Sequence, residues 1–294
     1  MGVDEGPEIA SLKGEECARD HELTALPVDP FAVAKKAEIE VYEKSSKPGV
    51  SGMLLRVGDL FAIAYATHVS SEGFRRFSVA HELGHYYLPG HVDHVIGADG
   101  VHESRAGFAS ADRYEKEADL FAVGLLMPRA LFKKALQNAG DGLGAIERMA
   151  VLCRTSLTAT GIRLAELTDD ALAVVVSNPD EVEFCAMSKS FRTLGFTWLR
   201  RGTPIPRKTL TYRFNGDPAR ILNAERDEAT TDLQSWFTVQ GQNVDLVEEV
   251  VGLGRYEKTL TVLTVQSMPD EEETEDEERL VQSWTPTLSR SRRK

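Results

Sequence analysis

The sequence predicts an α+β fold in which a small mixed domain, a pair of short helices and a strand-rich module follow one another. Two apolar runs between residues 52 and 65 are separated by a Gly-Asp pair, a pattern typical of a β-hairpin. Apolar residues then recur at helical spacing from 71 to 88 and again from 111 to 126. Beyond residue 169, alternating apolar segments indicate strands.

The N-terminal segment determines where the ordered chain begins. Residues 1–28 are polar and acidic without periodicity, so we expect a disordered tail. Pro30 follows Asp29, a residue that can cap a helix, and precedes good helix formers. We therefore expect the first folded domain at 29–140, beginning with a short helix.

Helices are expected to continue at the end of this domain and after it. Pro128 interrupts the helical pattern, and further helices are predicted at 128–138, 143–153 and 157–167. The last two form a helix-turn-helix-like segment at 141–168, in which Ser156 can cap the second helix. That second helix carries one arginine and no Lys, Asn or Gln to read bases. A supporting or substrate-docking role is therefore favoured over DNA binding.

The rest of the chain is predicted to form a separate module and a tail. Strand signals lie at 171–176, 208–213 and 258–265. They indicate an α+β module at 169–267, for which sensory, dimerisation and substrate-docking roles remain open. An acidic run starting at Asp270 begins a disordered linker and C-terminal tail at 268–294. The sequence predicts no particular oligomeric state.

Charge and composition exclude some classes of function. The 294-residue chain has 34 basic and 46 acidic side chains, which give a net charge of −12. This charge opposes non-specific attraction to nucleic acid and to anionic lipid. A general DNA-coating role is therefore disfavoured.

The cysteines and the N-terminus indicate a cytoplasmic protein. Three cysteines without a C-x-x-C spacing, namely Cys17, Cys153 and Cys185, indicate neither a disulfide framework nor a cysteine zinc knuckle. The N-terminus lacks a basic region followed by an apolar stretch, and no uncharged run approaches the ~20 residues of a membrane helix. We therefore expect reduced thiols, a cytoplasmic location and no membrane contact.

The motif His81-Glu82-Leu83-Gly84-His85 carries the clearest chemical signal in the sequence. Residues four apart on a helix share one face, so the imidazoles of His81 and His85 can bind one metal ion. A zinc ion held by two histidines and one further protein ligand keeps an open position for water. Glu82 is suited to accept the proton that this water loses. The motif therefore predicts a catalytic zinc site with Glu82 as the base.

Two residues are candidates for the third ligand. Glu115 lies on the predicted 111–126 helix, and Asp119 follows it four residues later on the same face. In this gluzincin-like arrangement Glu115 binds the metal and Asp119 accepts the free N–H of a ligand histidine. His91 stands where a metzincin-like pattern has its third histidine, but Leu88 replaces the glycine that turns the chain there. We favour Glu115 and keep His91 as the alternative.

Glu117 and three of the histidines outside the motif are not expected to bind the metal. Glu117 is rotated by about 200° from Glu115 around the helix, so its side chain is expected to be solvated. The segment 90–109 is expected to form a long loop over the site. Three histidines are expected to be ordinary loop residues: His68, His94 and His102. Candidates to stabilise a tetrahedral oxyanion are Tyr86, Tyr87 or a histidine of that loop.

Two segments, 77–85 and 115–128, resemble the ImmA/IrrE family of metallopeptidases. The second segment has the pattern Glu-x-x-Ala-Asp-x-Phe-Ala followed by Leu-Leu-Met-Pro, which is typical of that family. The resemblance covers residues 29–168. It implies a small gluzincin-like zinc metallopeptidase domain at 29–140.

The resemblance also implies an activity and a partner. Family members cleave a helix-turn-helix repressor at one site and so derepress its genes, either in a stress response or in mobile-element induction. By the resemblance, His81, His85 and Glu115 match the metal ligands, and Glu82 matches the catalytic base. The expected cofactor is Zn²⁺, with Mn²⁺ as another divalent option, and the expected partner is the repressor.

A non-enzymatic role is the main alternative. The chain could be a regulatory protein- or DNA-binding module that keeps a metal site without proteolysis. Glu82 argues against this alternative, because a structural zinc is normally closed by four protein ligands and needs no adjacent base.

Overall fold

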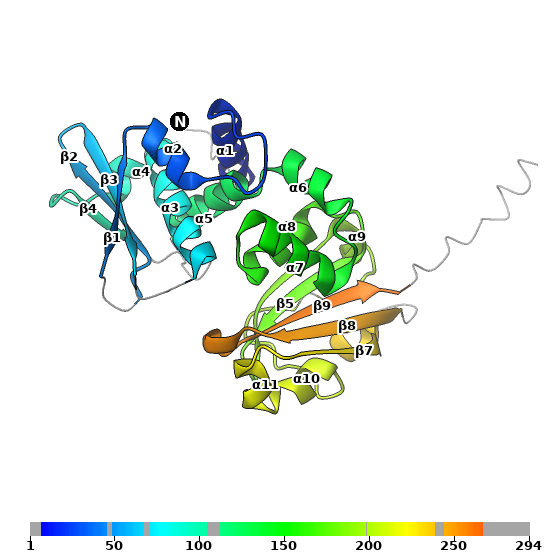
Figure 1. Ribbon diagram of the computed structural model, residues 1–294. Helices are drawn as coiled ribbons and strands as arrows, with labels where there is room; N and C mark the ends of the chain where they lie inside the picture. The colour runs from blue at the N-terminus through cyan, green and yellow to red at the C-terminus, as the bar shows by residue number, and fades with distance from the viewer. Residues whose placement is uncertain are drawn as a thin grey trace, which may run out of the picture.

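The structure is a computed structural model that describes residues 7–45, 49–67, 71–104, 112–197, 199–238 and 244–266. Two sheets lie in this part of the chain, and helices pack against both, which confirms the α+β class. In Figure 1 the first sheet and its helices occupy one end of the molecule. The second sheet lies at the other end, with α7 and α8 on its inner side.

The N-terminal segment is folded from residue 7, so the prediction of a disordered tail at 1–28 is wrong there. Helix α1 (Pro7–Asp20) packs along α5 (Arg113–Leu126). Gly14 and Gly124 allow the close approach, since a Cβ on Gly124 would stand 2.0 Å from the Ser11 carbonyl oxygen. Buried residues of α1 include Ala10, Cys17 and Ala18. These side chains are small, so the helical period of the segment carries little hydrophobic signal.

The predicted short helix and hairpin are both confirmed. Helix α2 (Pro30–Lys36) begins behind Asp29, whose carboxylate accepts a hydrogen bond from the Phe31 N–H. Strands β2 (Gly52–Val57) and β3 (Leu60–Ala66) pair in antiparallel fashion across a turn in which Gly58 has φ +63°. A left-handed φ of this kind favours glycine.

Two further strands complete the first sheet in the order β1-β3-β2-β4. Strand β1 (Glu40–Lys44) pairs parallel to β3 and is largely exposed, so its residues give no alternating apolar pattern. Strand β4 (Val101–Ser104) pairs with β2, and α4 (His91–Val95) precedes it. The prediction of a long loop at 90–109 is therefore wrong for these elements, and residues 105–109 lie outside the described ranges.

Helix α3 (Glu72–Tyr87) confirms the helix predicted from 71 to 88. It crosses α5 closely at Gly84, where a Cβ would stand 3.0 Å from the Cα of Ala118. The glycine thus makes room for a neighbouring helix. This crossing fixes the distance between the motif on α3 and the acidic residues of α5.

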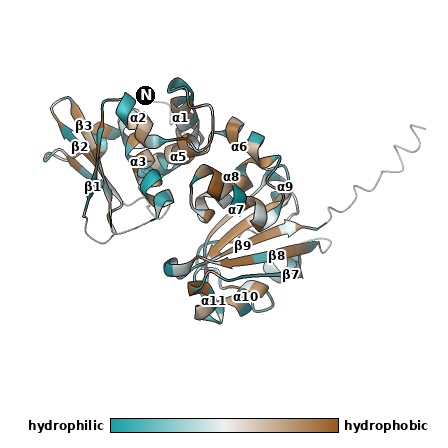
Figure 2. Ribbon diagram, viewed as in Figure 1, coloured by the Kyte–Doolittle hydropathy of each residue, from teal (hydrophilic) through white to brown (hydrophobic). Residues whose placement is uncertain are grey.

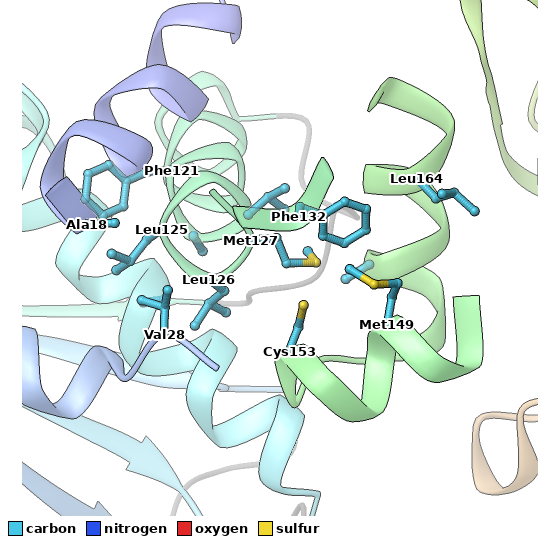
Figure 3. Close-up of a cluster of buried hydrophobic side chains, with 14 of the residues drawn as sticks. Ala18, Val28, Phe121, Leu125, Leu126, Met127, Phe132, Met149, Cys153 and Leu164 are labelled. Carbon is cyan, nitrogen blue, oxygen red and sulfur yellow. The ribbon is translucent and has the colours of Figure 1, made fainter. Parts of the chain in front are cut away.

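The helices predicted after Pro128 are present as α6 (Arg129–Leu136), α7 (Gly142–Cys153) and α8 (Leu157–Leu167). The Ser156 side chain caps α8 by accepting a hydrogen bond from the Ala159 N–H. The core shown in Figure 3 gathers side chains of α1, α5, α6, α7 and α8, including Phe121, Phe132, Met149 and Leu164. The helix pair is therefore part of the main core.

The second sheet has the order β6-β5-β9-β8-β7, and all its pairs are antiparallel. Its strands are β5 (Leu172–Ser177), β6 (Val182–Met187), β7 (Arg226–Asp232), β8 (Asp245–Gly252) and β9 (Thr259–Val265). One face packs on α7 and α8 through side chains such as Val174 and Val262. Figure 2 shows hydrophobic residues along α8 and along strands of this sheet.

Short helices lie on other parts of this module: α9 (Lys189–Arg192), α10 (Leu210–Asn215), α11 (Pro218–Leu222), α12 (Leu233–Trp236) and the 3-10 turn η1 (Gly254–Tyr256). The strand predicted at 208–213 is wrong, because this segment enters α10. The buried carboxylate of Glu248 accepts hydrogen bonds from the N–H groups of Leu210 and Thr211, which stabilises a helix start there. That contact joins residues distant in sequence and gives no local signal.

Two remaining predictions concern the ends of the chain and membranes. The linker and tail predicted at 268–294 lie outside the described residues. In the part of the chain that the structure describes, no helix combines the length and apolar character needed to cross a bilayer.

Candidate metal centre

Helix α3 brings the two motif histidines together. Ser71 caps the helix by accepting a hydrogen bond from the Phe74 N–H. His81 and His85 lie on one face of α3 and are fully buried. Their Nε2 atoms are 3.1 Å apart. Since zinc binds imidazole nitrogen at about 2.0–2.1 Å, this separation suits two ligands of one ion.

Helix α5 supplies the third group from its first turn. The Asp112 carboxylate caps α5 by accepting hydrogen bonds from the N–H groups of Tyr114 and Glu115. Glu115 Oε1 lies 3.2 Å from His85 Nε2, and Glu115 Oε2 lies 3.5 Å from His81 Nε2. One ligand atom from each of the three residues falls within 4.8 Å of the others.

The chemistry of this set fits a divalent metal ion. Two imidazoles and one carboxylate are a donor set that zinc accepts. Glu115 Oε2 is buried and accepts no hydrogen bond from the described residues. A buried carboxylate oxygen without a donor is costly unless a cation lies near it. The structure therefore brings the predicted residues together as a candidate His-His-Glu metal site.

Asp119 contacts the far side of His81. Its Oδ1 atom lies 2.8 Å from Nδ1 of His81, and both residues are buried. Burial lowers the pKa of His81, but the contacts with Asp119 and Glu115 outweigh burial and raise the pKa to about 10. The acidic surroundings thus favour positive charge at this position. The placement is the one expected of a group that fixes the orientation of a ligand histidine.

His91 contacts the far side of His85. Its Nδ1 atom lies 3.2 Å from Nδ1 of His85, whereas Nε2 of His85 faces His81 and Glu115. The structure therefore does not bring His91 into the group of ligand atoms, and the metzincin-like set is not the one assembled. Burial lowers the pKa of His85 to about 3, so this imidazole is neutral.

The prediction that Glu117 is solvated is wrong. Its Oε2 atom lies 3.0 Å from His91 Nε2, and its Oε1 atom accepts a hydrogen bond of 2.6 Å from Arg113 Nε. Its side chain is only 14% exposed. The two-residue spacing places Glu117 on another face of α5 than Glu115. On that face it contacts His91 of α4.

His102 is also not an ordinary loop residue, contrary to the prediction. It lies on β4, with its Nε2 atom 3.0 Å from Glu115 Oε1 and its ring centroid 4.6 Å from that of His85. His102 and Ser104 share the inner face of the strand by the two-residue alternation of β structure. Recognition of β4 would have found His102, but four residues give a weak strand signal. His94 stacks on Tyr114, and His68 lies outside the described residues.

Glu82 lies fully buried beside the two histidines. Neither of its carboxylate oxygens has a hydrogen-bond partner among the described residues. Gly52 of β2 makes room for it, since a Cβ there would stand 2.4 Å from Glu82 Oε1. Burial raises the pKa of Glu82 to about 7, against the lowering effect of His81. A carboxylate with a pKa near neutrality can both accept and release a proton.

The two tyrosines after the motif make other contacts. The Tyr86 ring packs edge-on against Phe61, with centroids 5.1 Å apart. The Tyr87 hydroxyl lies 3.0 Å from Nε2 of His21, and its ring stacks on Phe121. Of the residues named for an oxyanion role, His91 and His102 contact the candidate ligand group: His91 lies at the far side of His85, and His102 contacts Glu115.

The fold and the site together define a mixed α+β domain with a candidate metal centre on two crossing helices. Residues 39–165 match the family model described as the IrrE N-terminal-like domain, Peptidase M78, so this part of the chain is similar to that domain. The match confirms the resemblance to the ImmA/IrrE family and supports a peptidase.

Two other comparisons add less. No curated protein matches the chain. A solved structure described as a Mycobacterium tuberculosis transcriptional regulator is similar, with a TM-score of 0.57 and 11% identity, over 88% of this chain and 76% of that one. At this identity the similarity concerns the fold alone.

Proposed function

We propose that the chain is a zinc-dependent endopeptidase that cleaves a helix-turn-helix transcriptional repressor at one site. The observation that carries the proposal is the convergence of His81, His85 and Glu115 beside Glu82, whose buried carboxylate has no described hydrogen-bond partner. A metal site that also holds an adjacent base has the parts needed for peptide hydrolysis.

The residues have distinct roles in this proposal. His81, His85 and Glu115 would hold the ion, which when bound polarises a carbonyl and acidifies water. Glu82 accepts the proton of the attacking water on a carboxylate oxygen and passes it to the leaving amine. Asp119 holds the imidazole of His81 through Nδ1.

His102 is the proposed oxyanion-stabilising residue. It approaches the ligand group from β4, and its side chain is 14% exposed. A donor at the edge of the site can reach a substrate oxygen on which negative charge develops. Tyr86 and Tyr87 are less suited, because their rings pack against other aromatic side chains.

The family match and the helix pair α7 and α8 support a folded protein as the substrate. The single arginine of α8, Arg163, is fully buried and contacts Glu15 at 2.6 Å, so it supports packing and does not face a nucleic acid. This burial supports a scaffolding or docking role for α7 and α8. The structural neighbour described as a transcriptional regulator is compatible with a role in gene control.

The non-proteolytic alternative has one specific observation in its favour. His102 Nε2 lies 3.0 Å from Glu115 Oε1 and could supply a fourth ligand. Four protein ligands would close the site, as in structural zinc centres. The chain would then be a regulatory module that keeps a metal without hydrolysis.

Substrate specificity tests the proposed function. The zinc-loaded protein would be incubated with casein, with an unrelated helix-turn-helix protein and with the repressor encoded beside its gene, and fragment masses would be measured. We expect one defined cut in the neighbouring repressor alone. Digestion of casein, or no cleavage of any repressor despite bound metal, would overturn the proposal.

A further inference from the structure

A chain of polar side chains continues outward from His85. His85 Nδ1 lies 3.2 Å from His91 Nδ1, and His91 Nε2 lies 3.0 Å from Glu117 Oε2. Glu117 Oε1 accepts a hydrogen bond of 2.6 Å from Arg113 Nε. The four linked side chains come from α3, α4 and α5, so the contacts join three separate elements.

The donor and acceptor of each hydrogen bond between these residues follow from the carboxylate of Glu117. An ionised carboxylate only accepts, so His91 Nε2 carries the hydrogen and donates it to Glu117. In neutral His91 the other nitrogen, Nδ1, then has a free lone pair and accepts from Nδ1–H of His85. This order leaves the lone pair of His85 on Nε2, the atom that faces His81 and Glu115.

We propose that His91 and Glu117 are positioning residues that fix the tautomer and ring orientation of His85 for metal binding. The inference rests on the metal site of the proposed function and does not depend on the peptidase reaction. Asp119 contacts His81 directly, whereas Glu117 reaches His85 through the intervening imidazole of His91. Each of the two proposed ligand histidines is thus linked through Nδ1 to a carboxylate of α5, directly for His81 and through His91 for His85.

Local structure places His91 in this role. Gly90 has φ +76° and forms the N-terminal cap of α4, which turns the chain directly after Pro89. His91 is 1% exposed, and its ring lies edge-on to that of Tyr114, with centroids 4.9 Å apart. His94, on the same short helix, is exposed and contacts no candidate ligand in the described structure.

Metal affinity tests the inference without reference to activity. Zinc affinity would be measured by competition with a chromogenic chelator for the full-length protein and for His91→Leu, Glu117→Ala and the double variant. Loss of a residue that orients a ligand typically costs about 10–100-fold in metal affinity. We expect each single variant to lose affinity in this range and the double variant to lose little more, because Glu117 acts through His91.

Two further variants serve as controls. Glu117→Gln keeps an oxygen that can accept from His91 Nε2, so it should retain most of the affinity that Glu117→Ala loses. His94→Ala, on the same helix, should bind zinc like the wild type. Far-UV circular dichroism of the metal-free proteins identifies any variant that does not fold. If His91→Leu does not fold, the zinc affinities of Glu117→Ala and Glu117→Gln test the positioning role.

Three results would overturn the inference: wild-type affinity in Glu117→Ala, additive losses in the double variant, or loss in His91→Leu without loss in Glu117→Ala. The last would make His91 itself a ligand. If the wild type binds zinc and cleaves nothing, the proposed function fails while these affinities still test the positioning role.

Discussion

Oδ1 of Asp119 lies 2.8 Å from Nδ1 of His81, one helical turn along α5 from Glu115. The contact joins two buried side chains, so removing the carboxylate leaves an imidazole N–H without an acceptor. We expect Asp119→Ala to weaken zinc binding by about 10–100-fold and Asp119→Asn to weaken it less, because the amide oxygen can still accept. Asp93→Ala is the control, since that side chain is 88% exposed. Equal affinity in Asp119→Ala and the control would contradict the orienting role.

The ligand set predicts a rank order of metal retention. The wild type should bind about one zinc ion per chain, as expected for one three-ligand site. His81→Ala, His85→Ala and Glu115→Ala should each lose most of it on dialysis against a weak chelator. His91→Leu should retain more zinc than Glu115→Ala, because His91 contacts His85 and lies outside the group of candidate ligand atoms. The reverse order would restore the metzincin-like alternative.

Substitution of His102 distinguishes the proposed peptidase from the non-proteolytic regulatory module. If it stabilises the oxyanion, His102→Ala should keep its zinc and lose turnover, by about 10²–10³-fold as for other donors of this kind. If it is a fourth ligand, the same variant should lose zinc affinity. Measuring metal content and cleavage rate on one preparation therefore decides between an open peptidase site and a closed regulatory site.

The packing of α1 on α5 predicts a stability effect at Gly124. A methyl group there would meet the Ser11 carbonyl oxygen at 2.0 Å, so the two helices must separate. We expect Gly124→Ala to lower the free energy of unfolding by about 1–3 kcal/mol, the usual cost of overpacking.

Gly144→Ala in α7 is the matched control for this effect. A Cβ at Gly144 meets only the end of the Arg148 side chain, at 3.3 Å. Since alanine favours helix over glycine by up to about 1 kcal/mol, this variant should be neutral or stabilised. Urea denaturation midpoints would compare the two variants, and equal effects would argue against the close contact between α1 and α5.

Sequence periodicity predicted the elements whose own residues carry a strong signal. Helix α3 and the β2–β3 hairpin have apolar residues at the spacing of their structure, and the turn has the glycine that its φ requires. The grouping of His81, His85 and Glu115 was also predicted, because helix spacing and a family-like motif fixed both halves of the site.

The missed features depend on contacts between distant residues. Helix α1 packs through small side chains, and α10 begins where Glu248 of β8 supplies acceptors for its first N–H groups. Glu117 and His102 looked ordinary because their partners, His91 and Glu115, come from other elements. None of these contacts can be recognised from the periodicity of one segment.

The most direct test of the central claim is the cleavage rate of Glu82→Gln on the neighbouring repressor, with zinc content measured on the same sample. Glutamine keeps the size of the side chain and removes the proton acceptor, so the variant should fold and hold about one zinc ion per chain. We expect turnover to fall by about 10²–10⁴-fold, the usual contribution of general-base catalysis. Wild-type turnover in a zinc-loaded Glu82→Gln protein would contradict the proposed mechanism.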